Sequence, residues 1–418
     1  MMANGNTELA DLVVAAAAEI NATASYFGSL NPNAAIHEAM AKKGSLASQV
    51  TDLIAADDEF GDLRQGWLQY GIGGHQITAQ SLTIQLIRIA QKESDLHSTI
   101  RELKDFVASG MSGIEVFAPL AGLKVYGPVE LNDELSLIPW SDVPEMEQKR
   151  RFGDEQPYYI DQPVIMRVRP NSAVLLKIPT HRILFPSAQD AANSNKQIGK
   201  RIFSGYADDV VRCGVTLMNG PVGAVGMWTS LTNRAAQLLM HKGYSYNADL
   251  FDNILVNASL DPRNTNEEQF RDLFSKFVTV SPSEKDVLRV AIDRLNSRRL
   301  GLVDRAIDVG IALEVIMLHD NSKDRGELKY RTAIRGAAFL GGISSERVAN
   351  FNTIKEAYDL RSEAVHKGKL EDKKPGRRNA GMIIKDTSDL LLRIVDKIIK
   401  TGKFPRWEDY VLNIGFGD

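Results

Sequence analysis

Residues 357–368 read AYDLRSEAVHKG, and this stretch places an arginine and a histidine, Arg361 and His366, five positions apart. No other part of the chain brings residue types that do chemistry together at so short a spacing. The stretch lies near the end of the last long helical block, and Gly368 is well placed to end its helix. We therefore expect residues 264–418 to fold as an α-helical bundle around it.

The helices of this bundle are predicted from apolar residues that recur every three or four positions. Residues 300–318 are apolar nearly all round, which is typical of a buried central helix. Glu314 interrupts this helix, and a buried carboxylate is costly unless an arginine such as Arg335 or Arg361 pairs with it. Further helices are expected over 267–278, from 283 to 295, and over 327–340, 345–367 and 382–399. The helix of Arg361 carries a stripe predicted to face the core: Val348, Phe351, Ile354, Tyr358, Arg361 and Val365.

An arginine and a histidine close together suit phosphoryl chemistry that needs neither a metal nor a cofactor. A guanidinium can hold a phosphate and its developing charge, and an imidazole can move a proton to or from a ribose hydroxyl. On an ideal helix, five residues turn the chain by about 500°, so the two side chains diverge by about 140°. Either the helix loosens before His366, or two copies of the chain meet and form a shared cleft.

Two other interpretations of the same residues exist. In a purely structural arrangement, Arg361 pairs with Glu314 and His366 is an ordinary residue at a helix end, since ion pairs also occupy packing faces. Asp359, Ser362 and His366 superficially suggest a hydrolase triad. One helix face cannot supply a nucleophile elbow and an oxyanion hole, so we reject the triad.

The C-terminal third resembles the HEPN superfamily, and specifically its ApeA-like branch, over residues 265–400. The resemblance rests on RAIDVGIALE at 305–314, on the Tyr-Arg pair at 330–331, and on YDLRSEAVH at 358–366. The segment 125–131, which reads VYGPVEL, is also similar to β-rich domains that precede HEPN in that branch.

This resemblance implies a metal-independent endoribonuclease of an anti-phage abortive-infection or toxin type. In such enzymes the ribose 2′-hydroxyl attacks the adjacent phosphate at a site formed across a HEPN dimer. Arg361 would stabilise the phosphate, His366 would transfer protons, and Ser362 takes the polar position after the arginine. The alternative is a catalytically silent HEPN module that binds nucleic acid or regulates a partner protein. The remaining candidates are two supporting residues, Asp359 and Glu314, and five that could contact RNA: Tyr330, Arg331, Arg335, Lys367 and Lys369.

The rest of the chain has a different character, so a multidomain α+β protein is expected. Residues 1–112 are predicted to be helical, with a heptad pattern of Leu and Ile over 81–107 that favours packing within the domain or a coiled-coil contact. Residues 113–263 are predicted to form a β-rich domain, because short Val- and Ile-rich runs alternate with Pro, Gly and Asn. Its expected strands cover 123–127, 135–140, 164–169, 173–177, 183–185 and 210–217, with one helix over 232–242.

Composition narrows the possible partners and compartments. Cys213 is the only cysteine, which excludes an internal disulfide and favours a reducing, cytoplasmic location. The apolar run 12–18 is too short to span a bilayer and follows no basic segment, so no membrane association is expected. From Ser283 onward, 26 Lys+Arg against 21 Asp+Glu give a net charge of +5, and the remainder carries −8. This asymmetry favours a polyanion such as RNA as partner of the C-terminal part.

Overall fold

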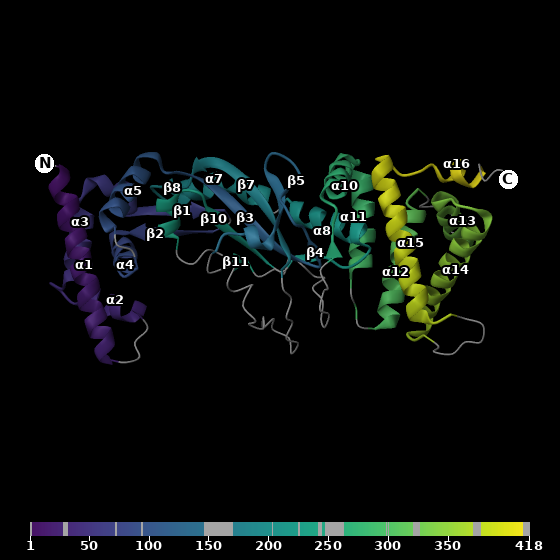
Figure 1. Cartoon of the computed structure of the whole chain (residues 1–418), viewed down its shortest axis with the longest axis horizontal. Coiled ribbons are helices and arrows are strands. Elements are labelled where there is room, and N and C mark those ends of the chain that lie inside the picture. The colour runs from purple at the N-terminus through teal and green to yellow at the C-terminus, as the bar shows by residue number, and fades with distance from the viewer. Residues whose placement is uncertain are drawn as a thin grey trace. The chain divides into compact units, whose positions relative to one another are not determined.

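The computed structural model of the chain is a mixed α+β fold with a C-terminal helical region (Figure 1). It describes residues 2–27, 32–71, 73–92, 95–145, 170–202, 204–224, 226–240, 245–246, 263–297, 299, 301–320, 327–370 and 378–412. Within that part of the chain, no helix combines the length and the apolar character needed to cross a membrane.

The first half of the chain mixes helices with short strands. In order, its elements are α1 (Met2–Phe27), α2 (Pro32–Ala41), α3 (Leu46–Ala56), η1 (Asp58–Leu63), β1 (Gln65–Tyr70), β2 (Gly73–Thr78), α4 (Ala79–Ala90), α5 (Leu96–Ser109), β3 (Met111–Ala121), β4 (Leu123–Lys124), β5 (Val129–Glu130), β6 (Leu135–Pro139), η2 (Trp140–Asp142), β7 (Ser172–Arg182), β8 (Leu184–Phe185) and α7 (Ala188–Ile202).

Helices dominate the second half. Its elements are α8 (Tyr206–Met218), β9 (Gly223–Ala224), β10 (Met227–Leu231), α9 (Arg234–Leu239), β11 (Ser245–Tyr246), β12 (Arg263–Asn264), α10 (Glu267–Thr279), α11 (Pro282–Asn296), α12 (Leu302–Met317), α13 (Leu328–Leu340), α14 (Ser344–Lys367), α15 (Ala380–Thr401) and α16 (Trp407–Leu412).

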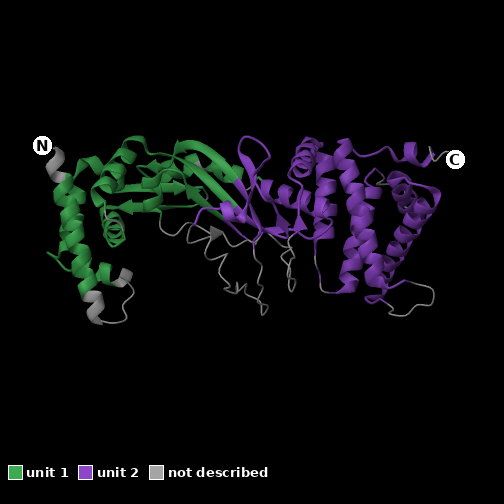
Figure 2. Cartoon of the chain, viewed as in Figure 1, with its two compact units in different colours: residues 1–117, 176–204, 228–245 green, residues 118–175, 205–227, 246–418 purple. Residues whose placement is uncertain are grey.

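The chain divides into two compact units (Figure 2). Unit 1 contains residues 1–117, 176–204 and 228–245, and unit 2 contains residues 118–175, 205–227 and 246–418. The three regions expected from the sequence, 1–112, 113–263 and 264–418, stay a prediction.

Unit 1 contains a β-hairpin where the sequence suggested only helices. β1 pairs antiparallel with β2, from Gln65 opposite Thr78 to Tyr70 opposite Gly73, and β1 also pairs with β8. Gly71 has a φ of +66°, which a glycine adopts without strain, so the glycine-rich stretch makes the hairpin turn. The single helix expected over 81–107 is instead two helices, α4 and α5. The heptad pattern is interrupted because Asp95 accepts a hydrogen bond from the Ser98 backbone N–H and starts α5.

The strands expected in the middle of the chain are found in part. The predictions over 135–140, 173–177 and 183–185 correspond to β6, β7 and β8, and the helix within 232–242 is α9. The strand predicted over 123–127 is shorter, at β4, and the one over 164–169 lies outside the described residues. The strand predicted over 210–217 is wrong, because these residues belong to α8, whose buried face includes Val210, Cys213 and Gly214. A Val-rich run does not distinguish a strand from a buried helix.

In unit 2 the predicted C-terminal helices are confirmed as α10 to α15. α12 is buried along most of its length, as expected for the central helix, and contacts α11, α13, α14 and α15. α14 in turn contacts α12, α13 and α15. Gly368, with a φ of +63°, ends α14 and donates its N–H to the Ala364 carbonyl, so His366 lies in the last turn as predicted.

Unit 2 also includes α8 and the short strand after it. Asn296 of α11 pairs with the backbone of Val222 in both directions: Nδ2 donates to the carbonyl at 2.8 Å and Oδ1 accepts from the N–H at 3.3 Å. Because the Asn296 side chain is buried, its amide needs hydrogen-bond partners inside the protein, and the N–H and carbonyl of Val222 provide them. The helical bundle therefore extends beyond the boundary that periodicity alone suggests.

Candidate functional site around Arg361

The Arg361 side chain extends from α14 to α12 and ends at a carboxylate. Its Nη2 donates to Glu314 Oε2 at 3.1 Å, and the two side chains remain 26% and 25% exposed. Of the two arginines considered from the sequence, Arg361 is thus the one that pairs with Glu314. Because both groups keep contact with solvent, the guanidinium is held in place without being sealed inside the bundle.

A glycine on α12 makes room for the stem of this arginine. A Cβ atom at Gly310 would overlap the Cγ of Arg361 and lie 2.6 Å from its Cβ. The aliphatic part of Arg361 therefore fills the space that a side chain at Gly310 would occupy.

Tyr358 completes the surroundings of the guanidinium from one turn earlier on α14. Its ring centroid lies 5.9 Å from Arg361 Cζ, and its hydroxyl interacts with the Glu314 carboxylate. Burial, followed by the Glu314 charge, raises the pKa of Tyr358 above its usual value. The phenol therefore stays protonated at neutral pH. Within the described residues, Arg361 Nε is buried and meets no acceptor.

His366 is exposed in the last turn of α14, and Ser362 is half-buried. The helix stays regular through Lys367, so it does not loosen before His366. On such a helix the side chains of Arg361 and His366 still diverge by about 140°. A single copy of α14 does not aim both groups at one phosphate.

The stripe predicted to face the core is only partly right. The buried residues of α14 are Ile354, Ala357, Leu360, Glu363 and Ala364. Val348 and Val365, by contrast, are 55% and 48% exposed. Spacing by three or four fits either face of a long amphipathic helix, and contacts with α12, α13 and α15 select the face that is buried.

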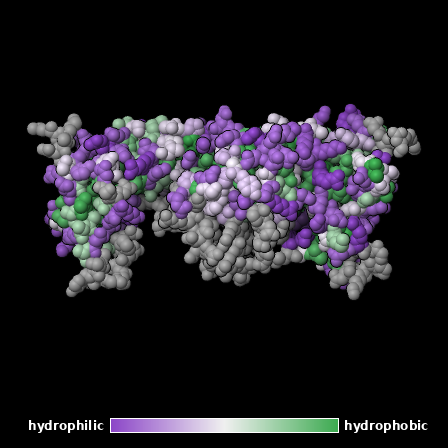
Figure 3. Space-filling model, in the orientation of Figure 1, coloured by the Kyte–Doolittle hydropathy of each residue, from purple (hydrophilic) through white to green (hydrophobic). Residues whose placement is uncertain are grey.

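The solvent-facing side of α14 consequently carries its own heptad pattern. Exposed apolar residues are visible among the C-terminal helices in Figure 3. We use the name α14 seam for six residues on this side of the helix, which combine apolar side chains with one lysine and one serine. They are separated by three and four positions alternately: Val348, Phe351, Lys355, Tyr358, Ser362 and Val365. Each member is exposed or half-exposed.

The remaining candidates lie in different surroundings. Asp359 forms an exposed ion pair with Lys329 at 2.6 Å, and the half-exposed Tyr330 meets Phe351 edge-on at 5.5 Å between ring centroids. Arg335 is buried, with Nη1 donating to Asp320 at 2.9 Å, which is a structural arrangement and not an exposed contact for RNA. Arg331 is half-exposed, and Lys367 and Lys369 are exposed near His366.

Further charged clusters tie helices together in the described part of unit 2, and two of them contain a buried aspartate. Asp209 of α8 accepts from Arg212 and from Arg289 of α11, and Arg212 also reaches Asp293. Asp308 of α12 is nearly fully buried and accepts from Arg294 and Arg299, each at 3.0 Å.

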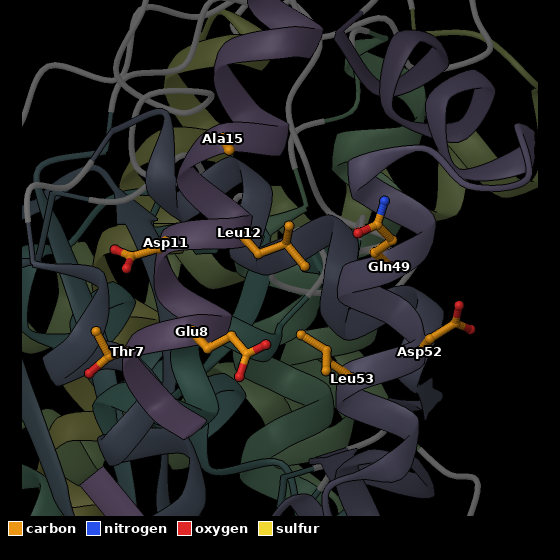
Figure 4. Close-up of a pocket in the computed structure, with 8 residues that line it drawn as sticks. All are labelled: Thr7, Glu8, Asp11, Leu12, Ala15, Gln49, Asp52 and Leu53. Carbon is orange, nitrogen blue, oxygen red and sulfur yellow. The ribbon is translucent and has the colours of Figure 1, made fainter. Parts of the chain in front are cut away.

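Unit 1 contains an open pocket with a negatively charged lining (Figure 4). Glu8 and Leu12 of α1 and Leu53 of α3 point into the space between these helices. Asp11 and Asp52 add to the negative charge of the lining. An acidic lining repels phosphate, so this pocket by itself is not suited to a nucleic acid.

No protein-family model, curated protein or solved structure matches the chain. The residues around Arg361 therefore have to be interpreted from their own chemistry.

Periodicity does not reveal the roles of two residues of this site. Gly310 lies in the interior of a helix, where a glycine costs about 1 kcal/mol relative to alanine, and that cost is the signal that it has a packing role. Periodicity places Tyr358 on a stripe predicted to face the core, and its position beside Arg361 and Glu314 follows only from the placement of α12 beside α14.

Proposed function

We propose that residues 264–418 form a HEPN-like bundle and that the protein is a metal-independent endoribonuclease of an abortive-infection or toxin type, acting in the cytoplasm. The observation that carries the proposal is the state of Arg361: Glu314 holds it at 3.1 Å, yet a quarter of its side chain stays exposed. It shares a helix with the exposed His366. An arginine that only neutralised Glu314 would not need an edge open to solvent.

The chemistry needs few groups. The ribose 2′-oxygen bonds to the adjacent phosphorus, the bond from phosphorus to the 5′-oxygen breaks, and a 2′,3′-cyclic phosphate and a 5′-hydroxyl result. Arg361 stabilises the negative charge that builds up on the phosphate oxygens. His366 accepts the proton of the 2′-hydroxyl or supplies one to the leaving 5′-oxygen.

A dimer solves the problem of divergent side chains. Taking about 100° per residue, Arg361 projects about 80° to one side of the α14 seam, and His366 about 60° to the other. If two copies pack through this seam with their α14 helices parallel, about a two-fold axis that runs along the helices, each interface contact occurs twice. The Arg361 side of one copy then faces the His366 side of the other. The apolar members of the seam give the second copy a surface to cover, and RNA enters at its edge.

The decisive experiment is cleavage of RNA by the purified full chain in the presence of EDTA. Wild-type protein should cut RNA, and Arg361→Ala and His366→Ala should each lower cleavage by at least about 10²-fold, since charge stabilisation and proton transfer each contribute on that scale. Expression of the wild type should slow bacterial growth, and expression of either variant should not.

Arg347→Ala provides a matched control on the same helix. Arg347 donates to the Gly342 carbonyl near the start of α14, far from Arg361 along the helix, so its loss should leave cleavage intact. Cleavage that persists in His366→Ala, or that stops with EDTA alone, contradicts the mechanism. Binding of RNA without any cleavage by the wild type would instead support the silent HEPN module.

A further inference from the structure

We propose that Gly310 and Tyr358 are positioning residues that fix the Arg361 guanidinium for phosphate contact. This inference rests on the role proposed above for Arg361. Neither residue touches the reacting atoms: Gly310 determines where the arginine stem lies, and Tyr358 acts through Glu314.

Gly310 faces the part of the Arg361 side chain that is nearest to the backbone. The overlap created by a Cβ at this position involves the Cβ and Cγ of Arg361, with Cδ also close at 3.3 Å. These atoms are the root of the side chain, so rotation of the guanidinium cannot relieve the contact. A methyl group at Gly310 therefore moves either the whole Arg361 side chain or the local backbone of α14.

Tyr358 lies beside both members of the Arg361–Glu314 pair. Glu314 accepts from Arg361 Nη2 and also interacts with the Tyr358 hydroxyl, and the Tyr358 ring centroid lies 5.9 Å from Arg361 Cζ. With Glu314 fixed, one edge of the guanidinium is occupied and its orientation is set, and the exposed remainder is left for a ligand. Without the hydroxyl, Glu314 is held to α14 by Arg361, and its carboxylate can turn toward the solvent.

Placement matters because charge stabilisation works only when the donor is already aimed at the developing charge. A displacement of about 1 Å at a reacting centre can lower the rate by about 10²-fold. Phosphate attraction by a displaced guanidinium in the same cleft declines less steeply, because Coulomb attraction varies gently with distance. Loss of positioning is therefore expected mainly in kcat, with KM changing little.

The test compares Gly310→Ala and Tyr358→Phe with wild type in two measurements on the full chain. The first is RNA cleavage, where Gly310→Ala should lower kcat by about 10²-fold and Tyr358→Phe by about 10-fold, with KM within about threefold. The second is the NMR signal of the Arg361 Nε–Hε group, identified by its absence in Arg361→Lys. This signal should shift in both variants, because the group is buried beside the stem of the side chain.

Gly336→Ala is the matched control. Gly336 also lies inside a helix of this bundle, but its Cβ would meet the flexible Cδ1 end of Ile354 at 2.5 Å, so a small side-chain movement accommodates it. Both kcat and the Arg361 signal should stay as in wild type. Should Gly310→Ala not fold, Tyr358→Phe and Glu314→Gln, which keep the shape of the native side chains, carry the test.

Different measurements would contradict the ribonuclease function and the positioning role of Gly310 and Tyr358. A wild type that cuts no RNA defeats the proposed function, and the Nε–Hε signal still tests the positioning role. Unchanged kcat and an unshifted Arg361 signal in both Gly310→Ala and Tyr358→Phe would overturn the positioning role while leaving the ribonuclease intact.

Discussion

At the scale of single residues, two carboxylates of α12 differ in how many arginines they pair with and in how far solvent reaches them. Glu314 is a quarter exposed and shares Arg361 with solvent, whereas Asp308 is nearly fully buried and takes two arginines. A buried carboxylate with two guanidinium partners is fully satisfied and has no capacity left for a ligand. The first is suited to chemistry and the second to stability.

The role of Asp308 can be measured by replacing it with alanine. Asp308→Ala leaves Arg294 and Arg299 without their shared acceptor, and we expect the free energy of unfolding to fall by about 2 kcal/mol. Chemical denaturation of the full chain measures this change. Asp389→Ala, which removes only an exposed i,i+4 pair with Lys385 on α15, should leave the free energy of unfolding nearly unchanged. Equal effects of the two substitutions would contradict the structural role of Asp308.

At the scale of elements, α8 is attached to the bundle by charge as well as by packing. Asp209 joins α8 to Arg289 of α11, and Arg212 of α8 reaches Asp293 of α11 at 2.8 Å. Cys213 lies one residue after Arg212 and is fully buried. Burial, followed by the nearby charge of Asp209, raises the pKa of the Cys213 thiol well above its usual range. Because Cys213 is the only cysteine in the chain, its rate of reaction with a thiol reagent shows whether α8 stays packed against α11.

We therefore expect the native thiol to resist a thiol reagent at pH 8, and Asp209→Ala to speed the reaction by about 10-fold or more as α8 opens. The folded state holds the thiol proton more tightly than the unfolded state does. Its contribution to stability is thus complete below pH of about 8.5, and declines as the pH rises beyond that value. Asp272→Ala, which removes an exposed pair with Lys276 on α10, should leave the rate unchanged. A native thiol that reacts as fast as a free one would show that α8 is not held.

At the scale of the whole molecule, the α14 seam makes the quaternary state testable. Phe351→Glu combined with Val365→Glu places charge on one half-exposed and one exposed member of the seam, and neither side chain is buried in the core. We expect the wild type to be a dimer in sedimentation analysis and the double variant to be a monomer with native circular dichroism. Lost RNA cleavage in that folded monomer would link dimer formation to activity.

A matched control for this surface lies on α10. Val278→Glu also charges an exposed valine, 44% accessible, but lies outside the seam and should not change the oligomeric state. A wild-type protein that sediments as a monomer under conditions where it cuts RNA would exclude the shared cleft.

The helices of the C-terminal region follow from the amino-acid sequence. Periodicity locates α10 to α15, Gly368 marks the end of α14, and an acid inside α12, such as Glu314, requires a partner on a neighbouring helix. These features are local, because spacing, glycine conformation and the cost of an unpaired carboxylate act within a few turns. The same local signals were not sufficient for α8, where a Val-rich run suited a strand equally well.

Contacts between distant parts of the chain determine which face of α14 is buried, which arginine pairs with Glu314, and why α12 contains Gly310. Each of these depends on residues far apart in the sequence: Glu314 and Arg361 are 47 positions apart, and Asn296 and Val222 are 74 positions apart. A periodic pattern gives the direction of a side chain relative to its own helix, but not the neighbour that it meets. For Arg361, close packing against a glycine and pairing with a carboxylate arise only when α12 and α14 come together.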